Sequence, residues 1–359
     1  MGAVSTAITF EHFAHEDLAW FRDSASLAVT ARGAAATLAR RLGLSGHRSA
    51  EVALAVTEAA TNLHRHAVDG ALLLRVVRSG ERAGLEFLTV DSGPGMPDVG
   101  AALVDGASSA GSLGIGLGAV ARLADHFDLH SVPGRGTVMA ARFWPRGADG
   151  PVAAAALPPL SPVAGVTRPI SGESVCGDAW AVRTDVGEDT AHPAAVLVML
   201  CDGLGHGPLA ARASQAAVQA FHAARDLTPR GVLDAVHMAL RRSRGGAVAV
   251  ARIEPGRGRV LYCGIGNVSG FLVSEDGRKA LLSAPGIVGE HMRRVRTFEE
   301  ALPACGALVM HSDGLTERWD HRSMPGWLRH SPLVMAGQLL RAAAVRRDDA
   351  SVVVIKEAW

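Results

Sequence analysis

Cysteine and aromatic residues are scarce in this sequence, and no long hydrophobic run occurs. The cysteines form no CxxC pair, which argues against a structural zinc site and a disulfide framework; they are Cys176, Cys201, Cys263 and Cys305. Aromatic residues make up 4% and basic residues (36) balance acidic ones (35), so neither a base-stacking platform nor a broad phosphate-binding face is indicated. The longest apolar run, 194–201, is far shorter than the roughly 18 residues of a membrane span. We expect a cytoplasmic protein with no nucleic acid or membrane as partner.

Lysine is almost absent as well, because the chain has only Lys279 and Lys356. Neither of them lies in a glycine-rich segment. Walker-type nucleotide-binding loops and eukaryotic-type protein kinases both place a lysine at the phosphates of the nucleotide. Both classes are therefore disfavoured.

The length and composition indicate two domains. The chain has 359 residues, 48% of them hydrophobic, which exceeds what one hydrophobic core usually organises. After Pro145 the sequence becomes rich in alanine, proline and glycine and loses helical and strand periodicity, as an interdomain connection does. We expect a first domain over 1–145, a linker over 146–164 and a second domain over 165–359.

The first half has the pattern of an α/β domain with an antiparallel sheet. Apolar residues recur at helical spacing in three segments, which are 26–44, 50–67 and 117–127. Strands are expected in the segments 8–21, 72–78 and 85–90, and a closing hairpin is expected in 132–144.

Three features of this half indicate a polar binding site. Glu58 and Asn62 are four residues apart on an expected helix and share one face. Asp91 opens a tight turn with Gly93 and Gly95, which lets backbone approach a ligand closely. A glycine-rich loop then runs into a helix, where backbone amides suit phosphate oxygens, and its glycines are Gly111, Gly114, Gly116 and Gly118. Taken singly, these features are equally a solvated pair, an ordinary turn and a plain loop.

In this order, and with Gly136-Thr137 after them, the motifs resemble the GHKL ATPase superfamily. Within it they are most similar to the anti-sigma-factor serine kinases of the RsbT switch-kinase type. The resemblance spans about residues 48–144 and includes DGASSAGSLGIGLGAVARLADHFDLHSVPGRGT. It implies a Bergerat-type α/β sandwich that binds ATP with Mg²⁺.

The resemblance also implies a role for each matching residue. Asn62 would bind Mg²⁺ beside the triphosphate, and Asp91 would meet the adenine amino group. Thr137 would support the adenine end, and the segment from Gly111 to Gly118 would form the lid over the phosphates. Glu58 matches the general base that acts on the acceptor hydroxyl.

Other functions of this fold stay open. Histidine kinases share it, but His64 and His66 follow Asn62 on the nucleotide helix, and too little chain precedes them for a phosphoacceptor hairpin. A non-catalytic module that binds ATP and sequesters a sigma factor or activates a partner is the main alternative. Glu58 favours catalysis over that alternative. The intact glycines argue against a third reading, a degenerate sensor domain attached to a phosphatase.

In the second half, acidic residues stand at the ends of strand-like apolar runs such as 195–201 and 306–311. These residues are Asp178, Asp202, Asp313, Asp348 and Asp349. Carboxylates from several strand ends are the oxygen ligands that Mg²⁺ and Mn²⁺ prefer, and crowded carboxylates repel one another without cations. Each Asp-Gly pair alone is a common turn, whereas together they predict a paired-metal site.

The segments around these residues resemble the PPM (type 2C) phosphatases of the SpoIIE-like and RsbX-type branch. They are ESVCGDAW, CDGLGHGPLA, YCGIGNVSGF, HSDGL and RRDDASVVVI, within about residues 165–356. The resemblance implies an α-β-β-α sandwich and a metal-dependent serine/threonine phosphatase with two Mn²⁺ or Mg²⁺ ions. The implied ligands are Asp178, Asp202, the Gly203 carbonyl, Asp313 and Asp348.

In such a site Asp202 bridges the metals, which lie about 3.5–4 Å apart and activate a shared water for in-line attack on a phosphoserine. Asp349 stands where relatives often have asparagine, which suggests an outer or alternative ligand. His206 is either a proton donor or a residue that stiffens its loop, and we favour the second.

Together the resemblances imply a bifunctional partner-switching regulator. Its first domain would phosphorylate, and its second dephosphorylate, a serine or threonine on a STAS-domain antagonist or stressosome protein that controls a sigma factor or stress response. Opposed activities on one chain would only consume ATP unless a partner biases one of them. The alternative is a non-catalytic ATP-dependent sensor attached to a phosphoserine phosphatase.

Overall fold

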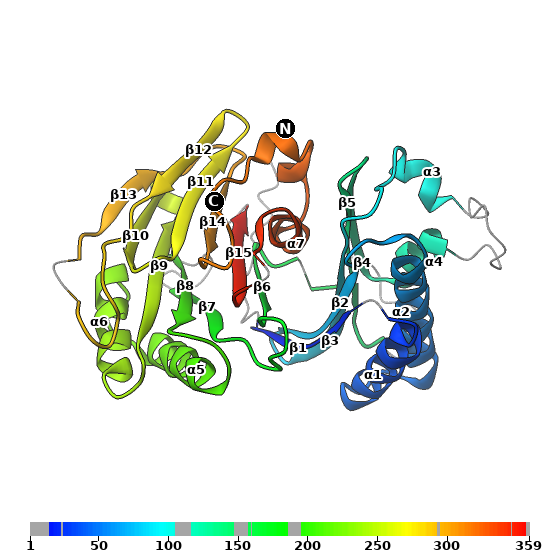
Figure 1. Cartoon of the computed structure of the whole chain (residues 1–359), viewed down its shortest axis with the longest axis horizontal. Helices are drawn as coiled ribbons and strands as arrows, with labels where there is room; N and C mark the ends of the chain where they lie inside the picture. Colours follow the sequence, from blue (N-terminus) through cyan, green and yellow to red (C-terminus); the bar gives the residue numbers. More distant parts are fainter. Residues whose placement is uncertain are drawn as a thin grey trace, which may run out of the picture. The chain divides into compact units, whose positions relative to one another are not determined.

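The computed structural model describes residues 14–22, 24–104, 116–146, 157–158, 160–185, 195–292, 295–345 and 347–356. The chain forms two compact units (Figure 1). The first unit combines Phe13–Leu160 with Asp320–Arg341. The second unit contains Ser161–Trp319 and Ala342–Trp359. The mixed α/β architecture in two units confirms the predicted fold class.

The first unit is built on a five-stranded antiparallel sheet in the order β1-β2-β3-β5-β4. Its strands are β1 (Ala14–Arg22), β2 (Ala71–Ser79), β3 (Arg82–Val90), β4 (His126–Val132) and β5 (Gly136–Phe143). Its helices, besides the last helix of the chain, are α1 (Leu27–Arg41), α2 (Gly46–His66), α3 (Val99–Leu103) and α4 (Gly116–Leu123). Helices α1, α2 and α4 lie on one side of the sheet (Figure 1). The apolar positions of α2, from Val52 to Leu63, are buried against α1 and the sheet.

The bounds of two helices differ from the predicted ones. Helix α2 begins four residues earlier than expected, because the Ser45 side chain caps it by accepting a hydrogen bond of 3.2 Å from the Arg48 amide. Helix α4 ends at Leu123, and the predicted continuation to residue 127 is wrong. His126 and Phe127 instead start β4 and pair with β5, so the pairing of the sheet overrides the local helical pattern.

A segment from far along the chain packs on the other face of this sheet. Helix α7 (Pro332–Ala343) is apolar almost throughout, and its residues 332–340 are all buried. Gly337 lies so close to the sheet that a Cβ there would be 2.8 Å from Val138 Cγ1 and 3.3 Å from Leu88. A helix that is apolar all round needs cover on every side. This second cover explains why β2 and β3 lack the alternating burial of a sheet with one wet face.

Strand β4 holds this segment by hydrogen bonds. The Asp128 carboxylate accepts from the Ser331 amide at 2.7 Å, and its other oxygen lies 2.7 Å from His330 Nδ1. Gln338 Nε2 donates to the His130 carbonyl at 3.2 Å. The predicted second domain, 165–359, included residues 320–341, but the structure packs them in the first unit.

The second unit contains two five-stranded sheets, in the orders β13-β10-β9-β8-β7 and β12-β11-β14-β15-β6. The strands of the first are β7 (Asp178–Asp185), β8 (Ala195–Gly203), β9 (Gly246–Glu254), β10 (Arg259–Ile265) and β13 (Phe298–Ala301). The strands of the second are β6 (Val163–Arg168), β11 (Ser269–Ser274), β12 (Gly277–Leu281), β14 (Ala307–His311) and β15 (Ala350–Lys356). Apolar residues of both sheets form one shared core cluster.

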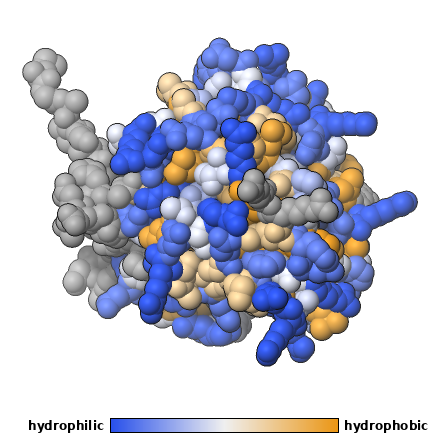
Figure 2. Space-filling view, turned by 90° about the vertical axis from the view of Figure 1, so that its left-hand side faces the viewer, coloured by the Kyte–Doolittle hydropathy of each residue, from blue (hydrophilic) through white to orange (hydrophobic). Residues whose placement is uncertain are grey.

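Helices α5 (Pro208–Ala223) and α6 (Pro229–Leu240) pack on the β13–β7 sheet and bury a second apolar cluster with it. Short 3-10 turns complete the chain at Pro255–Arg257, His321–Ser323 and Trp327–Arg329. On the face shown in Figure 2, hydrophilic residues predominate and hydrophobic ones form separate small patches. Among the described residues, no helix is both long and apolar enough to cross a membrane.

Candidate functional site

The turn after β3 is tied to the hairpin of β4 and β5. The Asp91 amide donates to the Thr137 carbonyl at 3.0 Å, and Asp91 Oδ1 accepts from the Gly93 amide at 2.7 Å. The Ser131 and Thr137 hydroxyl oxygens are 2.9 Å apart, and Ser131 Oγ accepts from the Met96 amide at 2.8 Å. The structure therefore brings together Asp91 and Thr137, the two residues that the resemblance places at the adenine.

Two glycines make this close approach feasible. Gly95 has φ +65° and Gly136 has φ +90°, backbone angles that residues other than glycine rarely adopt. A Cβ on Gly136 would lie 2.0 Å from the Asp91 carbonyl oxygen, and one on Gly95 would lie 2.2 Å from the Val132 carbonyl oxygen. Any other residue at either place would push the aspartate turn off the hairpin.

The C-terminal end of α2 borders the same turn. A Cβ on Gly93 would lie 2.5 Å from the His66 carbonyl oxygen. Asn62 and Glu58, both half-buried, lie one and two turns respectively before this end, on one face of α2. His64 and His66 are exposed in the last turn.

The glycine-rich loop is described only at its end. Gly116 begins α4 with open space around the position of a Cβ, and Gly118 is buried two residues further on. Gly111 and Gly114 lie outside the described residues. The predicted lid is therefore represented here by the first turn of α4, whose backbone amides are free of intrahelical partners.

Burial raises the pKa of Asp91 from its usual value, while hydrogen bonds from Gly93 and Thr137 and the charge of Arg341 act in the opposite direction. Arg341, in the last turn of α7, was missed by the sequence reasoning. No local motif distinguishes it among the many arginines, and only the packing of residues 320–341 in this unit brings it near Asp91.

In the second unit, sheet register brings the predicted carboxylates together. Asp178 begins β7 and is paired directly with Asp202 near the end of β8. Asp202 is also hydrogen-bonded to Asp313, which follows β14. The charge of Asp348, just before β15, acts on both Asp202 and Asp313. All four predicted carboxylates therefore belong to one cluster.

The electrostatics of this cluster are those of crowded negative charge. Burial raises the pKa of Asp178 to about 7, with further upward contributions from Asp349 and Asp313. Burial and then the charges of Asp178, Asp313 and Asp348 raise the pKa of Asp202 to about 9. Without a cation, the cluster therefore retains protons at neutral pH.

Neutral side chains that the sequence reasoning did not single out orient these carboxylates. Ser351 Oγ donates to Asp178 Oδ2 at 2.7 Å, and Ser312 also hydrogen-bonds to Asp178. Asn267 Nδ2 donates to Asp313 Oδ2. The only sequence signal for them is their position beside the acidic segments.

Asp349 has a different task from its neighbour. It is buried, and its two oxygens accept from the backbone amides of Ile170 and Gly177, both at 2.7 Å. These bonds hold the segment that leads into Asp178. The hypothesis of an alternative ligand is not supported, because both oxygens of Asp349 are engaged with backbone.

Gly203 and His206 follow the second aspartate. A Cβ on Gly203 would lie 2.5 Å from the Ala210 carbonyl oxygen and 2.9 Å from that of Gly177, so only glycine fits. His206 is exposed, and its Nδ1 lies 3.2 Å from Glu173 Oε1. This contact favours bracing of the loop over proton donation.

The donor set fits a hard divalent cation, because every predicted side-chain ligand is a carboxylate and their repulsion needs a counter-charge. Within the described residues, no three acidic, histidine or cysteine side chains already form a closed ligand group. Asp202 and Asp313 bond to each other, and Asp178 bonds to serine. Binding a cation would exchange the bond between Asp202 and Asp313 for metal–oxygen contacts.

Comparisons with known proteins match the first and the later part of the chain to two different families. A family model of the histidine kinase-like ATPase domain matches residues 21–142, and the stage II sporulation protein E (SpoIIE) model matches residues 192–356. The serine/threonine-protein kinase RsbT of Bacillus subtilis (strain 168) is 37% identical over 118 residues, which are 33% of this chain and 89% of RsbT.

The phosphoserine phosphatase RsbX of the same organism is 24% identical over 145 residues, which are 40% of this chain and 69% of RsbX. A solved structure of RsbX in complex with magnesium covers 54% of this chain and 92% of RsbX, with 22% identity and a TM-score of 0.45. The chain therefore belongs to the family of RsbT through its histidine kinase-like ATPase domain, which is fused here to a SpoIIE-family domain.

Proposed function

We propose that this protein is a partner-switching regulator that adds phosphate to a serine or threonine of a STAS-domain protein at one site and removes it at the other. The observation that carries the proposal is that one chain contains two separate sites. One site is the turn that contains Asp91 and is packed closely through glycines beside α2. The other is the carboxylate cluster at the ends of β7, β8 and β14. The likeness to a kinase and to a phosphoserine phosphatase supports the two activities.

In the kinase site, each residue has a task set by its chemistry. The ionised Asp91 accepts a hydrogen bond from the adenine amino group. Asn62 offers an amide oxygen to Mg²⁺ beside the triphosphate. Glu58, one turn earlier on the same face, accepts the proton of the acceptor hydroxyl as that oxygen attacks the γ-phosphorus and ADP leaves. The amides at Gly116 line the phosphates from the first turn of α4.

In the phosphatase site, Asp202 is the central carboxylate, and Asp178, Asp313 and Asp348 complete the ligand set with the Gly203 carbonyl. When bound there, divalent cations supply charge stabilisation and activate a water for attack on the phosphoester. Asn267 and Ser351 fix the directions of Asp313 and Asp178. Asp349 holds the segment that precedes β7 in place by accepting hydrogen bonds from two backbone amides.

A metal-removal experiment tests the phosphatase half. The full chain with Mn²⁺ should hydrolyse p-nitrophenyl phosphate, and EDTA should abolish the activity until Mn²⁺ is restored. Release of p-nitrophenolate measures the rate. Hydrolysis that persists in EDTA would overturn the metal-dependent assignment.

Arg341 should set the pH range of nucleotide binding. Its positive charge keeps the pKa of Asp91 lower than burial alone would, so Arg341→Met should raise that pKa further. The protonated carboxyl loses its acceptor for adenine, and the variant should therefore lose ATP affinity at a higher pH than the wild type when the pH is lowered. Calorimetric ATP titrations across the acidic range measure the two midpoints.

Arg135→Met is the matched control, because Arg135 is exposed in the turn between β4 and β5 and acts on Arg341 but not directly on Asp91. Its midpoint should stay near that of the wild type. Identical midpoints for the wild type and Arg341→Met would show that ATP binding does not depend on the ionised form of Asp91.

A further inference from the structure

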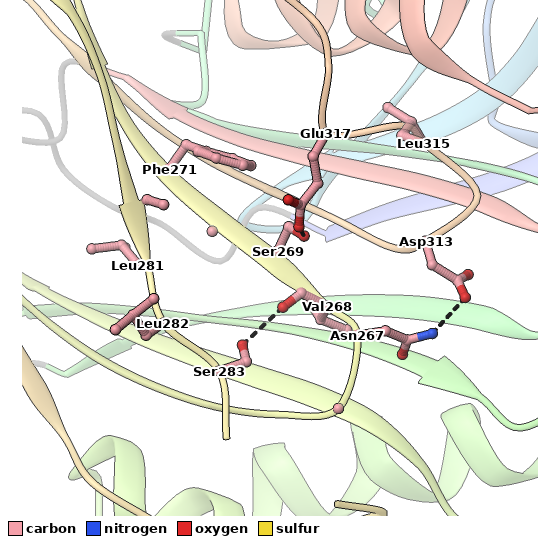
Figure 3. A pocket seen from close by; sticks show the side chains of 13 residues that line it. Asn267, Val268, Ser269, Phe271, Leu281, Leu282, Ser283, Asp313, Leu315 and Glu317 are labelled. Carbon is pink, nitrogen blue, oxygen red and sulfur yellow. Dashed lines mark hydrogen bonds between the residues drawn. The ribbon is translucent and has the colours of Figure 1, made fainter. Parts of the chain in front are cut away.

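A cavity of about 400 Å³ lies beside the carboxylate cluster of the second unit. Three segments form it: the turn from β10 into β11 at residues 266–271, the end of β12 at 280–283 and the loop 313–317. Figure 3 shows the side chains that line this space. The cavity contributes nothing to the two sites described above, apart from the shared residues Asp313 and Asn267.

The walls combine apolar and polar groups. Leu281, Leu282, Leu315 and Phe271 supply aliphatic and aromatic surface. Leu282 is 62% exposed, so its side chain remains free to cover part of a ligand. Ser283 Oγ donates to the Val268 carbonyl at 2.8 Å, which closes one wall. Such walls suit the methylene stem of a long side chain.

The charge of the cavity is negative. Its charged lining residues are Asp313 and Glu317, and none of the described residues that line it is cationic. Glu317 Oε1 accepts from Ser269 Oγ, and a carboxylate has further lone pairs to offer. Arg278 donates to the Glu317 backbone carbonyl at 2.6 Å and lies over the rings of Phe271 and Trp319 at 4.7 and 4.6 Å. Arg278 therefore bonds to the backbone of Glu317, while the Glu317 carboxylate can still pair with another cation.

The cavity is next to the place where a phosphoester would react. Asn267, one of its walls, donates to Asp313, which belongs to the carboxylate cluster (Figure 3). An extended peptide advances about 3.3 Å per residue. A side chain that enters the cavity therefore belongs to a residue close in sequence to the phosphoserine.

We infer that this cavity binds a basic side chain, a lysine or arginine of the substrate protein that lies within about three residues of the phosphoserine. The methylene stem packs on Leu282, and the cationic head pairs with Glu317. The inference rests on the proposed phosphatase function and adds the substrate feature that the site selects.

A lysine scan tests it on the full chain with Mn²⁺. The substrates are alanine-based heptapeptides with a central phosphoserine, each with a single lysine at one of the other positions, and phosphate release gives kcat/KM. We expect one or two positions to raise kcat/KM about fivefold over the peptide without lysine, the size of a favourable exposed ion pair. Glu317→Gln, which keeps an oxygen for Ser269, should remove that increase.

Glu275→Gln is the matched control, because it removes one exposed carboxylate from the turn between β11 and β12 without touching the cavity. It should keep the lysine preference. The rate of each variant on p-nitrophenyl phosphate, which has no side chain to place in the cavity, corrects for folding and metal loading.

The outcomes separate this inference from the function on which it rests. If no lysine position helps, if Glu317→Gln keeps the preference, or if leucine serves as well as lysine, the cavity does not select a basic side chain. If the wild type hydrolyses neither the peptides nor p-nitrophenyl phosphate, the proposed phosphatase function fails and this inference fails with it.

Discussion

Asp202→Asn should abolish the hydrolysis of phosphoserine by the full chain and at the same time stabilise the metal-free protein at neutral pH. The rate should fall by about 1,000-fold or more, because the variant loses the carboxylate that joins the others of the cluster. A variant that is inactive only because it unfolds would lose stability instead. Loss of activity together with a gain in stability would therefore identify Asp202 as a carboxylate whose role is to bind a cation.

The expected gain in stability follows from the raised pKa values. Asp202 titrates at about 9 and Asp178 at about 7 in the folded protein, against an ordinary value of 3.8. A group whose pKa is raised by folding stabilises the fold fully below its ordinary pKa, and this contribution is lost as pH rises through the folded value. The metal-free wild type should therefore lose stability between about pH 4 and pH 9, and Mn²⁺ should restore it.

The neutral amide in Asp202→Asn removes the larger of these two losses of stability, because no carboxylate charge then has to be buried there. Its second unit should melt about 3 °C or more above the metal-free wild type at pH 8, and added Mn²⁺ should raise its melting temperature little. Calorimetric melts with EDTA and with Mn²⁺ measure both shifts. Asp234→Asn, on a partly exposed aspartate paired with Arg230, is the control and should leave both the activity and the response to Mn²⁺ intact. Lower stability of metal-free Asp202→Asn would contradict the account.

Asn62→Ala should abolish binding of ATP with Mg²⁺ to the full chain, with a loss of affinity of about 100-fold or more. The side chain is half-buried on the face of α2 that leads to the Asp91 turn, and alanine offers no oxygen to the cation. Calorimetry with a non-hydrolysable ATP analogue measures the affinity. Unchanged affinity would remove Asn62 from the nucleotide site.

Glu58→Gln is the matched partner of that variant. The amide keeps the shape of the side chain but accepts no proton at neutral pH, so ATP should still bind while phosphate transfer to the substrate falls by about 100-fold or more. If Glu58→Gln transferred phosphate at the wild-type rate, Glu58 would not be the general base. If the wild type itself binds ATP without any transfer, the first domain is a binding module rather than a kinase.

Much of both sites could be predicted from the sequence because their residues lie at the ends of strongly patterned elements. The apolar run 195–201 places Asp202 at the end of β8, and the strand-like segment 85–90 places Asp91 after β3. In both cases local sequence determines the element, and the element carries the polar residue to its edge. Asp178 meets Asp202 only through the pairing of β7 with β8, and Asp313 reaches Asp202 from the other sheet, so neither contact can be read from the strand pattern.

The remaining features depend on contacts between distant residues. Asp349 looks like its neighbour Asp348 in the sequence, and only the amides of Ile170 and Gly177 show that it supports the site rather than forming it. The packing of α7 on the sheet of the first unit is likewise absent from local pattern, because an apolar helix carries no signal for the surface that it covers. Arg341 reaches Asp91 only through that packing.

The central claim is that one chain both adds and removes the same phosphate at two separate sites. The direct measurement is the intact mass of a STAS-domain substrate incubated with ATP, Mg²⁺ and Mn²⁺ and with each form of the full chain. Phosphorylated substrate should accumulate with Asp202→Asn, stay low with the wild type and be absent with Asn62→Ala. No accumulation with Asp202→Asn, or continued removal of phosphate from the phosphorylated substrate by that variant, would contradict it.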